Sequence, residues 1–330
     1  MRNKINKIYT NLVTAGFKNS KLLYYLKNYV RLKLPSVIYQ RQLDRKLRSL
    51  GCFNEEYINQ RVNYYNKIES DFSPSINAIR LDKLKLNIKG KTYVFDTREY
   101  TRYFPESNKL NFEFGDVTYI PEVPSIVKSR PIAGENANSV VLKLDKVRHF
   151  TFVKDRKDFL TKKDMIVWRG AFKKVHTHRI EFLKKYFGHP LCDVGHVSNL
   201  EPYLNWKVDR MNMCEQLNYK FIMCIEGYDV STSLKWVMSS KSLAVSPKPV
   251  YETWFMEGTL IPDYHYVLVK DDYSDLIEKM EYYIQHPDKA KAIIKNANDY
   301  IAQFKNKKRE DLISLLVLQK YFTKQINSIG

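Results

Sequence analysis

The spacing of apolar residues divides the chain into a helical first part and an α/β remainder. Apolar residues recur every three or four positions between residues 22 and 34, with Lys and Arg between them, and Pro35 ends the run. The stripe consists of Leu22, Leu23, Tyr25, Leu26, Tyr29, Val30 and Leu34. A basic amphipathic helix packs on the protein's own core or lies on an anionic lipid surface. We favour packing, with surface binding as an additional role.

The pattern changes over residues 78–150. Short runs rich in β-formers, such as 91–95 and 140–144, predict strands, and Gly, Pro and Asn separate them. Residues 115–138 contain three prolines and a further glycine, which predicts mostly loop. Loops on a rigid lobe often carry function.

From about residue 160 the chain alternates between strand and helix patterns. The run DMIVWRG predicts a short buried strand, and THRIEFLKKYF predicts the helix after it. YKFIMCIEG predicts a second buried strand that ends at Gly227, followed by a turn and a helix in VSTSLKWVMSS. KSLAVSP and HYVLVKD predict further strands, and residues 273–304 one or two helices. This alternation predicts a parallel sheet covered on both faces.

The charge of the chain narrows the class of partner. The formal net charge is +19, and the first 50 residues hold 12 Lys and Arg against one acid, Asp44. Such a field attracts nucleic acid, an anionic membrane or a phosphorylated glycan.

The cysteines and the apolar runs indicate the compartment. The four cysteines form no CxxC pair and have no zinc spacing, which predicts free thiols in a reducing compartment. We find no signal peptide and no run of about 18 apolar residues, so we expect a cytoplasmic protein, soluble or peripheral to the membrane.

Two strand-to-helix turns are candidate ligand sites, because ligands of open parallel sheets bind beyond the carboxyl ends of the strands. In the first turn, WRGAFKKVHTHRI, we expect Gly170 to allow a sharp turn after the strand. Arg179 falls in the first turn of the next helix, where its guanidinium can point back over the strand ends and bind a diphosphate. The alternative is a surface arginine beside two lysines.

The second turn, IEGYDVSTSLKW, combines a glycine with hydroxyl groups and a lysine at a helix start. The residues that could form an anion site there are Gly227, Ser231, Thr232, Ser233 and Lys235. The alternative is a capped structural turn. The P-loop and Rossmann fingerprints are absent, as are HExxH, GxSxG and DxD. Without a DxD, charge stabilisation falls to Arg, Lys and a helix dipole.

These turns belong to an ordered series of motifs that resembles glycosyltransferase family 90. The series runs over roughly residues 110–305 and includes FGDVTYIPEVPSIVKSRPI, NSVVLKL, RHF, WRG and KFIMCIEGYDVSTSLKWVMSSKSLAV, and it looks most like the bacterial lipopolysaccharide branch. The resemblance implies an α/β fold of GT-B type, with two Rossmann-like lobes facing a cleft and a helical N-terminal extension. It also implies metal-independent transfer, with inversion, from a UDP-sugar held on the C-terminal lobe, in agreement with the missing DxD, so we expect no metal and no other cofactor.

The resemblance also implies an organisation along the chain. We expect a basic helical segment over 1–75, an acceptor lobe over 76–158 and a nucleotide-sugar lobe over 159–304. The last segment, 305–330, is expected to be a helix that packs back on the N-terminal lobe.

Individual positions inherit expected roles from the family's motifs. Asp116 matches the catalytic base, which takes the proton of the acceptor hydroxyl. Arg179 matches a diphosphate contact, and Arg169 and Gly170 match the family's RG turn. Gly227 to Lys235 match the second phosphate turn.

One position departs from the family pattern, and three others have additional expected roles. Ser233 stands where protein O-glucosyltransferases carry an arginine, so Lys235 or Arg130 is expected to substitute. Glu252 matches loosely, as a nucleotide contact. Lys128 and Arg130 follow the base loop and are expected to bind a phosphorylated or acidic acceptor.

The leading hypothesis is therefore transfer of a hexose from UDP-glucose or UDP-galactose to a glycan or glycolipid in lipopolysaccharide or related surface-glycan synthesis. Peripheral contact with an anionic membrane would suit the basic N-terminal segment. A protein serine as acceptor is the second hypothesis, and the missing secretory signal and missing disulfides count against it. A basic nucleic-acid-binding protein is the third; no RRM-like or helix-turn-helix pattern supports it, so we expect no nucleic-acid partner.

Overall fold

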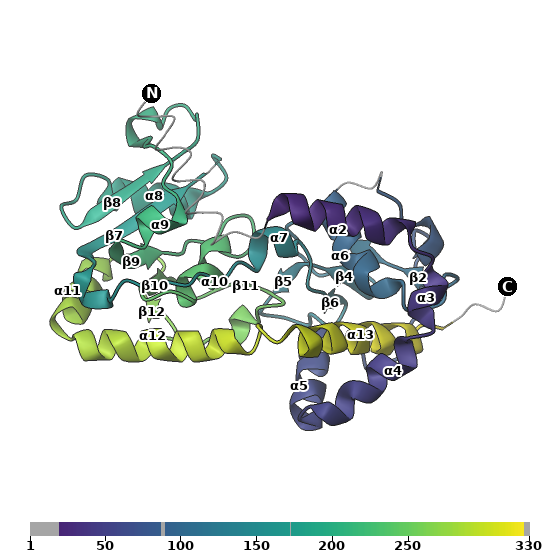
Figure 1. The fold of residues 1–330 in the computed structure, drawn as a ribbon. Helices are drawn as coiled ribbons and strands as arrows, with labels where there is room; N and C mark the ends of the chain where they lie inside the picture. The colour runs from purple at the N-terminus through teal and green to yellow at the C-terminus, as the bar shows by residue number, and fades with distance from the viewer. Residues whose placement is uncertain (1–19, 87–89, 172, 327–330) are drawn as a thin grey trace. The chain divides into compact units, whose positions relative to one another are not determined.

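A computed structural model describes residues 20–86, 90–171 and 173–326, which form two compact units (Figure 1). Residues 1–19 of the predicted basic segment and 327–330 of the predicted last segment lie outside the described residues. Unit 1 comprises Arg148–Pro249 and Thr259–Gln303, and unit 2 comprises Ser20–Val147, Val250–Gly258 and 304–326.

Unit 1 is built on a five-stranded parallel sheet with the order β12-β10-β9-β7-β8. Its strands are β7 (Lys163–Gly170), β8 (Cys192–His196), β9 (Tyr219–Met223), β10 (Leu243–Ser246) and β12 (Val267–Leu268). Every residue of β9 and β10 is buried, as expected for inner strands covered on both faces. The predicted parallel sheet is confirmed, although β9 ends at Met223, four residues before Gly227.

The strand order has one topological switch point. The chain adds β8 on one side of β7 and then crosses to place β9 on the other side, after which β10 and β12 continue outward. This is the doubly wound order in which ligands bind beyond the carboxyl ends of the two strands at the switch. In unit 1 these strands are β7 and β9.

Helices of unit 1 pack on this sheet around an apolar core. They are α8 (Thr177–Tyr186), α9 (Met213–Gln216), α10 (Thr232–Met238), α11 (Leu276–Gln285) and α12 (Pro287–Ala302). The core joins apolar residues of the strands to aromatic residues of α8 and apolar residues of α11 and α12. The helices predicted at THRIEFLKKYF, at VSTSLKWVMSS and over residues 273–304 are therefore confirmed. Short 3-10 turns lie at η3 (Phe159–Thr161) and η4 (Leu204–Trp206).

Unit 2 contains short strands in three small sheets. A parallel sheet has the order β3-β4-β6, and antiparallel pairs join β1 to β2 and β5 to β11. The strands are β1 (Ile79–Arg80), β2 (Lys109–Leu110), β3 (Phe112–Glu113), β4 (Ser125–Val127), β5 (Ser129–Pro131), β6 (Ser139–Val141) and β11 (Tyr251–Thr253). Thus β4 and β5 lie inside the stretch predicted to be mostly loop, because a three-residue strand leaves almost no periodic signal.

Helices complete unit 2. They are α2 (Lys21–Lys33), α3 (Ser36–Gln40), α4 (Leu43–Arg48), α5 (Glu55–Tyr65), α6 (Lys91–Thr101) and α13 (Lys307–Thr323), with 3-10 turns η1 (Ser49–Cys52) and η2 (Leu81–Lys83). The chain passes between the units within α7 (Lys146–His149) and again within η5 (Glu257–Thr259). Eight of the seventeen residues of α13 are buried, and the helix packs against α5 and α6.

A buried ionic network anchors α13 in unit 2. Glu310 accepts hydrogen bonds from Arg61 at 2.8 Å and from the indole of Trp254 at 2.6 Å, and Lys143 lies 3.4 Å away. Trp254 in turn stacks on Tyr65 with ring centroids 3.9 Å apart. A buried charge is tolerated only with partners of this kind. The network ties residues 250–258 and α13 to the helices of the first 65 residues.

The strand predicted at 91–95 is wrong, because this stretch is the start of helix α6. Buried residues Tyr93, Val94, Thr97, Tyr100 and Thr101 follow helical spacing across the whole helix. The five residues 91–95 alone are rich in β-formers, and the helical period appears only over eleven residues.

Helix α2 packs by a different face from the one predicted. The Tyr24 hydroxyl donates to Asp96 at 2.8 Å, Arg31 pairs with Glu99 at 2.7 Å, and Asn28 is buried. The apolar stripe instead faces solvent: Leu22 is 78% exposed and Leu26 is 58% exposed. The prediction that the stripe packs on the protein's own core is therefore wrong for most of its members.

The boundaries of the units differ from the segments expected from the sequence. Residues 20–75 belong to the same unit as the residues that follow them, and unit 1 begins at 148 where the sequence suggested 159. Residues 250–258 belong to unit 2 although the chain on both sides of them lies in unit 1. Among the described residues, no helix is long and apolar enough to cross a membrane.

Candidate active site

Arg179 lies at the switch point of the unit 1 sheet. Its Nε donates to the carbonyl of Glu226 at 2.8 Å, one Nη donates to the carbonyl of Ile225 at 3.1 Å, and the other Nη donates to the carbonyl of Ala171. These carbonyls follow β7 and β9, so one guanidinium spans both strand ends. Burial lowers the pKa of Arg179 to about 10, which keeps it charged at neutral pH. No carboxylate of the described residues forms an ion pair with it.

The two predicted glycines serve close packing at this place. A Cβ at Gly170 would lie 2.3 Å from the Trp168 ring, and a Cβ at Gly227 would lie 3.2 Å from an Nη of Arg179. Gly170 is the last residue of β7 and does not adopt positive φ. Its lack of a side chain therefore admits the indole of Trp168, and the sharp turn expected after it stays a prediction.

Arg169 points toward β8. It forms an ion pair with Asp193 at 2.5 Å and donates to the carbonyls of Asp193 at 2.7 Å and Trp168 at 3.0 Å. Its side chain is only 9% exposed. Two arginines of the same turn thus differ: Arg169 is neutralised by a carboxylate and Arg179 is not. For both arginines, a contact with the UDP-sugar remains a prediction.

The second predicted turn leads into helix α10. Ser231 is its N-cap residue, and the hydroxyls of Ser231 and Ser233 lie 2.9 Å apart. Thr232 is the first helical residue, and Lys235 is fully buried within the unit. The hydroxyls thus stand at the helix start as expected, whereas the Lys235 ammonium lies beneath the surface. A phosphate contact at these four positions remains a prediction.

Two residues of these turns for which the sequence predicted no role also lie near Arg179. His176 precedes α8, accepts a hydrogen bond at Nδ1 from the Lys173 amide at 3.1 Å, and packs edge-on against Tyr228 with centroids 4.6 Å apart. Burial, and next the charge of Arg179, lower the pKa of His176 to about 4, so its ring is neutral at neutral pH. Tyr228 follows Gly227 and is 45% exposed. Their position beside Arg179 appears only in the folded unit.

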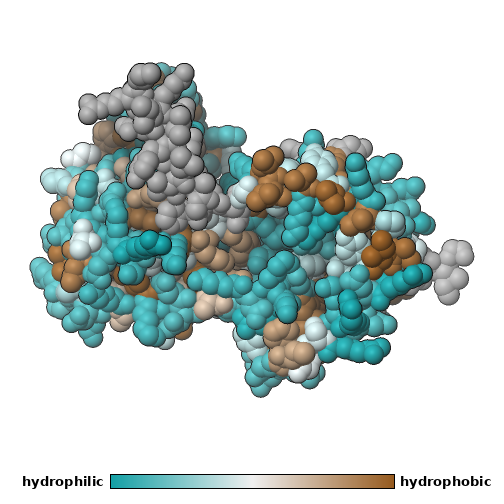
Figure 2. Space-filling model, viewed as in Figure 1, coloured by the Kyte–Doolittle hydropathy of each residue, from teal (hydrophilic) through white to brown (hydrophobic). Residues whose placement is uncertain are grey.

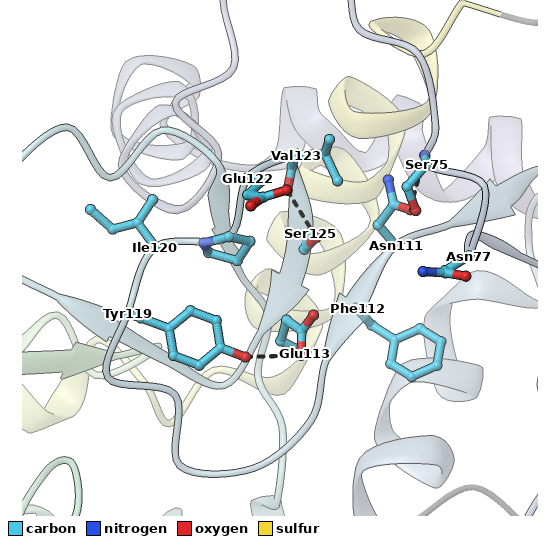
Figure 3. Close-up of a pocket in the computed structure, with 11 residues that line it drawn as sticks. Ser75, Asn77, Asn111, Phe112, Glu113, Tyr119, Ile120, Glu122, Val123 and Ser125 are labelled. Carbon is cyan, nitrogen blue, oxygen red and sulfur yellow. Dashed lines mark hydrogen bonds between the residues drawn. The ribbon is translucent and has the colours of Figure 1, made fainter.

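Asp116 lies in unit 2, on the loop between β3 and β4. Gly115 adopts a φ of +135°, which a residue with a side chain rarely does. Beyond it, the amide of Val117 donates to the Ser129 hydroxyl on β5 at 3.2 Å. The Tyr119 hydroxyl donates to Glu113 at 3.1 Å and closes the loop (Figure 3). The loop is thus fixed on both sides of Asp116.

The carboxylate of Asp116 has one strong partner. Lys128, only 2% exposed, donates to its Oδ1, while the Asp116 side chain is 30% exposed. Oδ2 makes no hydrogen bond with a described residue. The pair orients the carboxylate and leaves one oxygen for a hydroxyl from solvent or substrate.

The structure brings Arg130 and Glu252 together in unit 2. They form an ion pair at 2.8 Å across the β5–β11 pair, and both are buried. Arg130 also donates to the carbonyls of Ser139 at 3.0 Å and Tyr64 at 2.7 Å. Lys128 is 2% exposed and Arg130 is fully buried, and each cation is held in an ion pair within unit 2. The acceptor role of Lys128 and Arg130, like the nucleotide role of Glu252, stays a prediction.

The described residues contain no group of three or more His, Cys, Asp and Glu side chains arranged to hold a metal ion. The four cysteines are unpaired thiols.

Comparison with known proteins identifies the family. The sequence model of glycosyl transferase family 90 matches residues 139–324. The O-glucosyltransferase LpsA of Dichelobacter nodosus is 44% identical over 266 residues, which cover 81% of this chain and 83% of that protein. Protein O-glucosyltransferase 3 of Rattus norvegicus is 28% identical over 122 residues, which are 37% of this chain and 24% of that protein. A match of this extent, on a chain whose parallel sheet carries Arg179 at its switch point, shows that the protein belongs to glycosyltransferase family 90 and is a glycosyltransferase.

Proposed function

We propose that this enzyme transfers glucose, with inversion and without a metal ion, from UDP-glucose to a saccharide hydroxyl in lipopolysaccharide or a related surface glycan. The observation that carries the proposal is the 44% identity, over four fifths of the chain, to a bacterial O-glucosyltransferase. The geometry supports it, because an arginine without a carboxylate partner at the switch point suits a diphosphate. UDP-galactose is the competing donor.

In the proposed reaction, Asp116 takes the proton of the acceptor hydroxyl while that oxygen bonds to C1 of the glucose. The bond from C1 to the diphosphate oxygen breaks, and UDP leaves with the electron pair. Arg179 and the start of α10 stabilise the charge that develops on the diphosphate. Lys128 holds the carboxylate in position through Oδ1 and leaves Oδ2 for the proton.

The proposed architecture is GT-B, with unit 1 as the donor lobe and unit 2 as the acceptor lobe, in the cytoplasm. The parallel sheet of unit 1 and the smaller parallel sheet of unit 2 support this proposal, which requires a Rossmann-like sheet in each lobe. A protein acceptor is the second candidate, because a rat protein O-glucosyltransferase also matches. That match covers 37% of this chain, so the bacterial relative carries more weight.

Purified enzyme should release UDP from UDP-glucose in the presence of excess EDTA when a lipopolysaccharide core oligosaccharide is added. We expect UDP-galactose to react at least tenfold more slowly, because a pocket built to bind a hydroxyl rejects its misplaced isomer. Coupled detection of UDP measures both rates. Restoration of the rate by Mg²⁺ or Mn²⁺ after an inactive EDTA reaction would contradict metal independence. A faster reaction with UDP-galactose would reverse the donor assignment.

The exposed face of α2 gives the proposed site of membrane contact. Figure 2 shows apolar side chains gathered along α2 and α3. Those on α2 that are at least 44% exposed are Leu22, Leu23, Leu26, Tyr29 and Val30, and Leu34, Val37 and Ile38 continue the surface. Residues 20–48 contain eight Lys and Arg against one acid. Exposed apolar residues with flanking cations suit the surface of an anionic bilayer.

Replacing Leu22, Leu26 and Val30 by Gln should lower binding to phosphatidylglycerol vesicles at least tenfold, because each apolar side chain loses its burial in lipid. The wild type should bind phosphatidylcholine vesicles weakly. Replacing Leu160 and Ile261, which are also about half exposed but lie in unit 1, should leave binding unchanged. Vesicle flotation at low and high salt measures all of these. Unchanged vesicle binding by the triple variant would contradict a lipid partner.

A further inference from the structure

Unit 2 contains a cavity of about 470 Å³ at the loop that carries Asp116 (Figure 3). Phe112 and Glu113 line it from the strand before the loop, and Tyr119 and Glu122 line it from the segment after the loop. Its volume lies within the range of about 300–1,000 Å³ typical of small-molecule sites. Both stems of the loop that carries Asp116 thus form part of the cavity wall, and Asp116 itself does not line it.

The lining has the mixed chemistry that a sugar requires. Tyr119 is 54% exposed and Phe112 is half-buried, so both offer ring surface to the apolar C–H face of a sugar. Asn77 and Ser125 line the same cavity and can donate or accept hydrogen bonds. The carboxylates of Glu113 and Glu122 accept hydrogen bonds from hydroxyl groups. Among the described residues, no hydrogen bond or ion pair is made by the Glu122 carboxylate.

The charge of the lining is opposite to that of the protein. The chain holds 55 Lys and Arg and has a net charge of +19, yet none of the eleven described residues that line the cavity is basic. The nearby cations Lys128 and Arg130 are buried in ion pairs with Asp116 and Glu252. A phosphate or carboxylate in the cavity would therefore meet Glu113 and Glu122 without a compensating cation, and like charges repel.

We propose that this cavity binds one saccharide unit of the acceptor and that Glu113 and Glu122 make it select an uncharged or amino-bearing sugar over a phosphorylated or acidic one. The proposal rests on the proposed function, in which the acceptor is the saccharide that receives the glucose. It differs from the acidic acceptor expected from Lys128 and Arg130. Tyr119 has two tasks here: its ring contacts the sugar and its hydroxyl holds the loop to Glu113.

Binding is measured without donor, by saturation-transfer NMR and calorimetry, with a lipopolysaccharide core oligosaccharide before and after chemical dephosphorylation. The wild type should bind the dephosphorylated form about tenfold more tightly. Tyr119→Ala should weaken that binding about tenfold, whereas Tyr264→Ala, which removes a 49% exposed tyrosine of unit 1, should not change it. The melting temperature and the affinity for UDP should be unchanged in both variants.

Glu113→Gln combined with Glu122→Gln tests the charge selection. The double variant should bring the affinities for the two oligosaccharides to within about threefold of each other, and raised salt should reduce the wild-type preference, because salt screens the repulsion. Equal or tighter wild-type binding of the phosphorylated form, or full binding by Tyr119→Ala, would overturn the proposal. Failure of every UDP-sugar to react would instead reject the proposed function, since these binding measurements need no transfer.

Discussion

Asp116→Asn should lower kcat for glucosyl transfer by about 10²- to 10⁴-fold, the usual contribution of a general base. The amide keeps the shape of the carboxylate and can still face Lys128, but it cannot take the proton of the acceptor hydroxyl. Binding of UDP should be unchanged, because the donor turn lies in unit 1 and Asp116 in unit 2. Steady-state kinetics and calorimetry with UDP separate the two effects.

A matched control exists in the same unit. Asp71 also pairs with a lysine, Lys324, at 3.4 Å, but it lies on the exposed surface. Asp71→Asn should therefore retain the wild-type rate. An Asp116→Asn enzyme that works within about threefold of the wild type would remove Asp116 as the base.

Arg179→Met should lower kcat/KM for the donor about 100-fold and weaken UDP binding by a similar factor. The variant keeps the length of the side chain but loses the charge that suits a diphosphate, and hydrogen bonds to charged groups contribute about 1.5–3 kcal/mol. The kcat/KM and UDP affinity of Arg179→Lys should lie between those of the wild type and Arg179→Met, because lysine keeps the charge and loses the planar fork of the guanidinium. Steady-state kinetics with varied UDP-glucose give kcat/KM, and calorimetry with UDP gives the affinity.

The neighbouring arginine supplies the comparison. Arg169 lies in the same turn, but its charge is already paired with Asp193, so Arg169→Met should affect UDP binding less than Arg179→Met. Arg179 also holds three carbonyls, and the variant will lose some thermal stability for that reason. A loss of stability with unchanged UDP affinity would show that Arg179 is only structural.

The parallel sheet was predictable because its signals are local. The sequence of β7 and α8 is a buried apolar run followed by apolar residues at helical spacing. This pattern predicts where the strand-to-helix turns lie. Helix α6 was missed because its first five residues are typical of a strand and its period is visible only over eleven. The solvent exposure of the α2 stripe was also not predictable, because the spacing shows that a helix face is apolar but not whether another element packs on it.

The site was only partly predictable for a similar reason. The position of Asp116 came from a motif, but its pairing with Lys128 depends on two strands that the sequence hardly marks. Arg130 and Glu252 meet across 122 positions of chain, so no local pattern could show that their charges are buried together. His176 contacts Tyr228 of the second turn, 52 positions later in the chain, which no local pattern could show. The cavity beside the base loop likewise exists only once β3, β4 and Tyr119 are assembled.

The anomeric configuration of the product tests the central claim most directly. UDP-glucose carries an α linkage, and the account assigns a single displacement in which Asp116 activates the acceptor. The reaction in EDTA should be followed by proton NMR from its first minutes, before any rearrangement. The account predicts that the first product carries a β-glucosyl linkage and that Asp116→Asn forms almost none of it. An α-linked first product, or a reaction that starts only when metal is added, would contradict it.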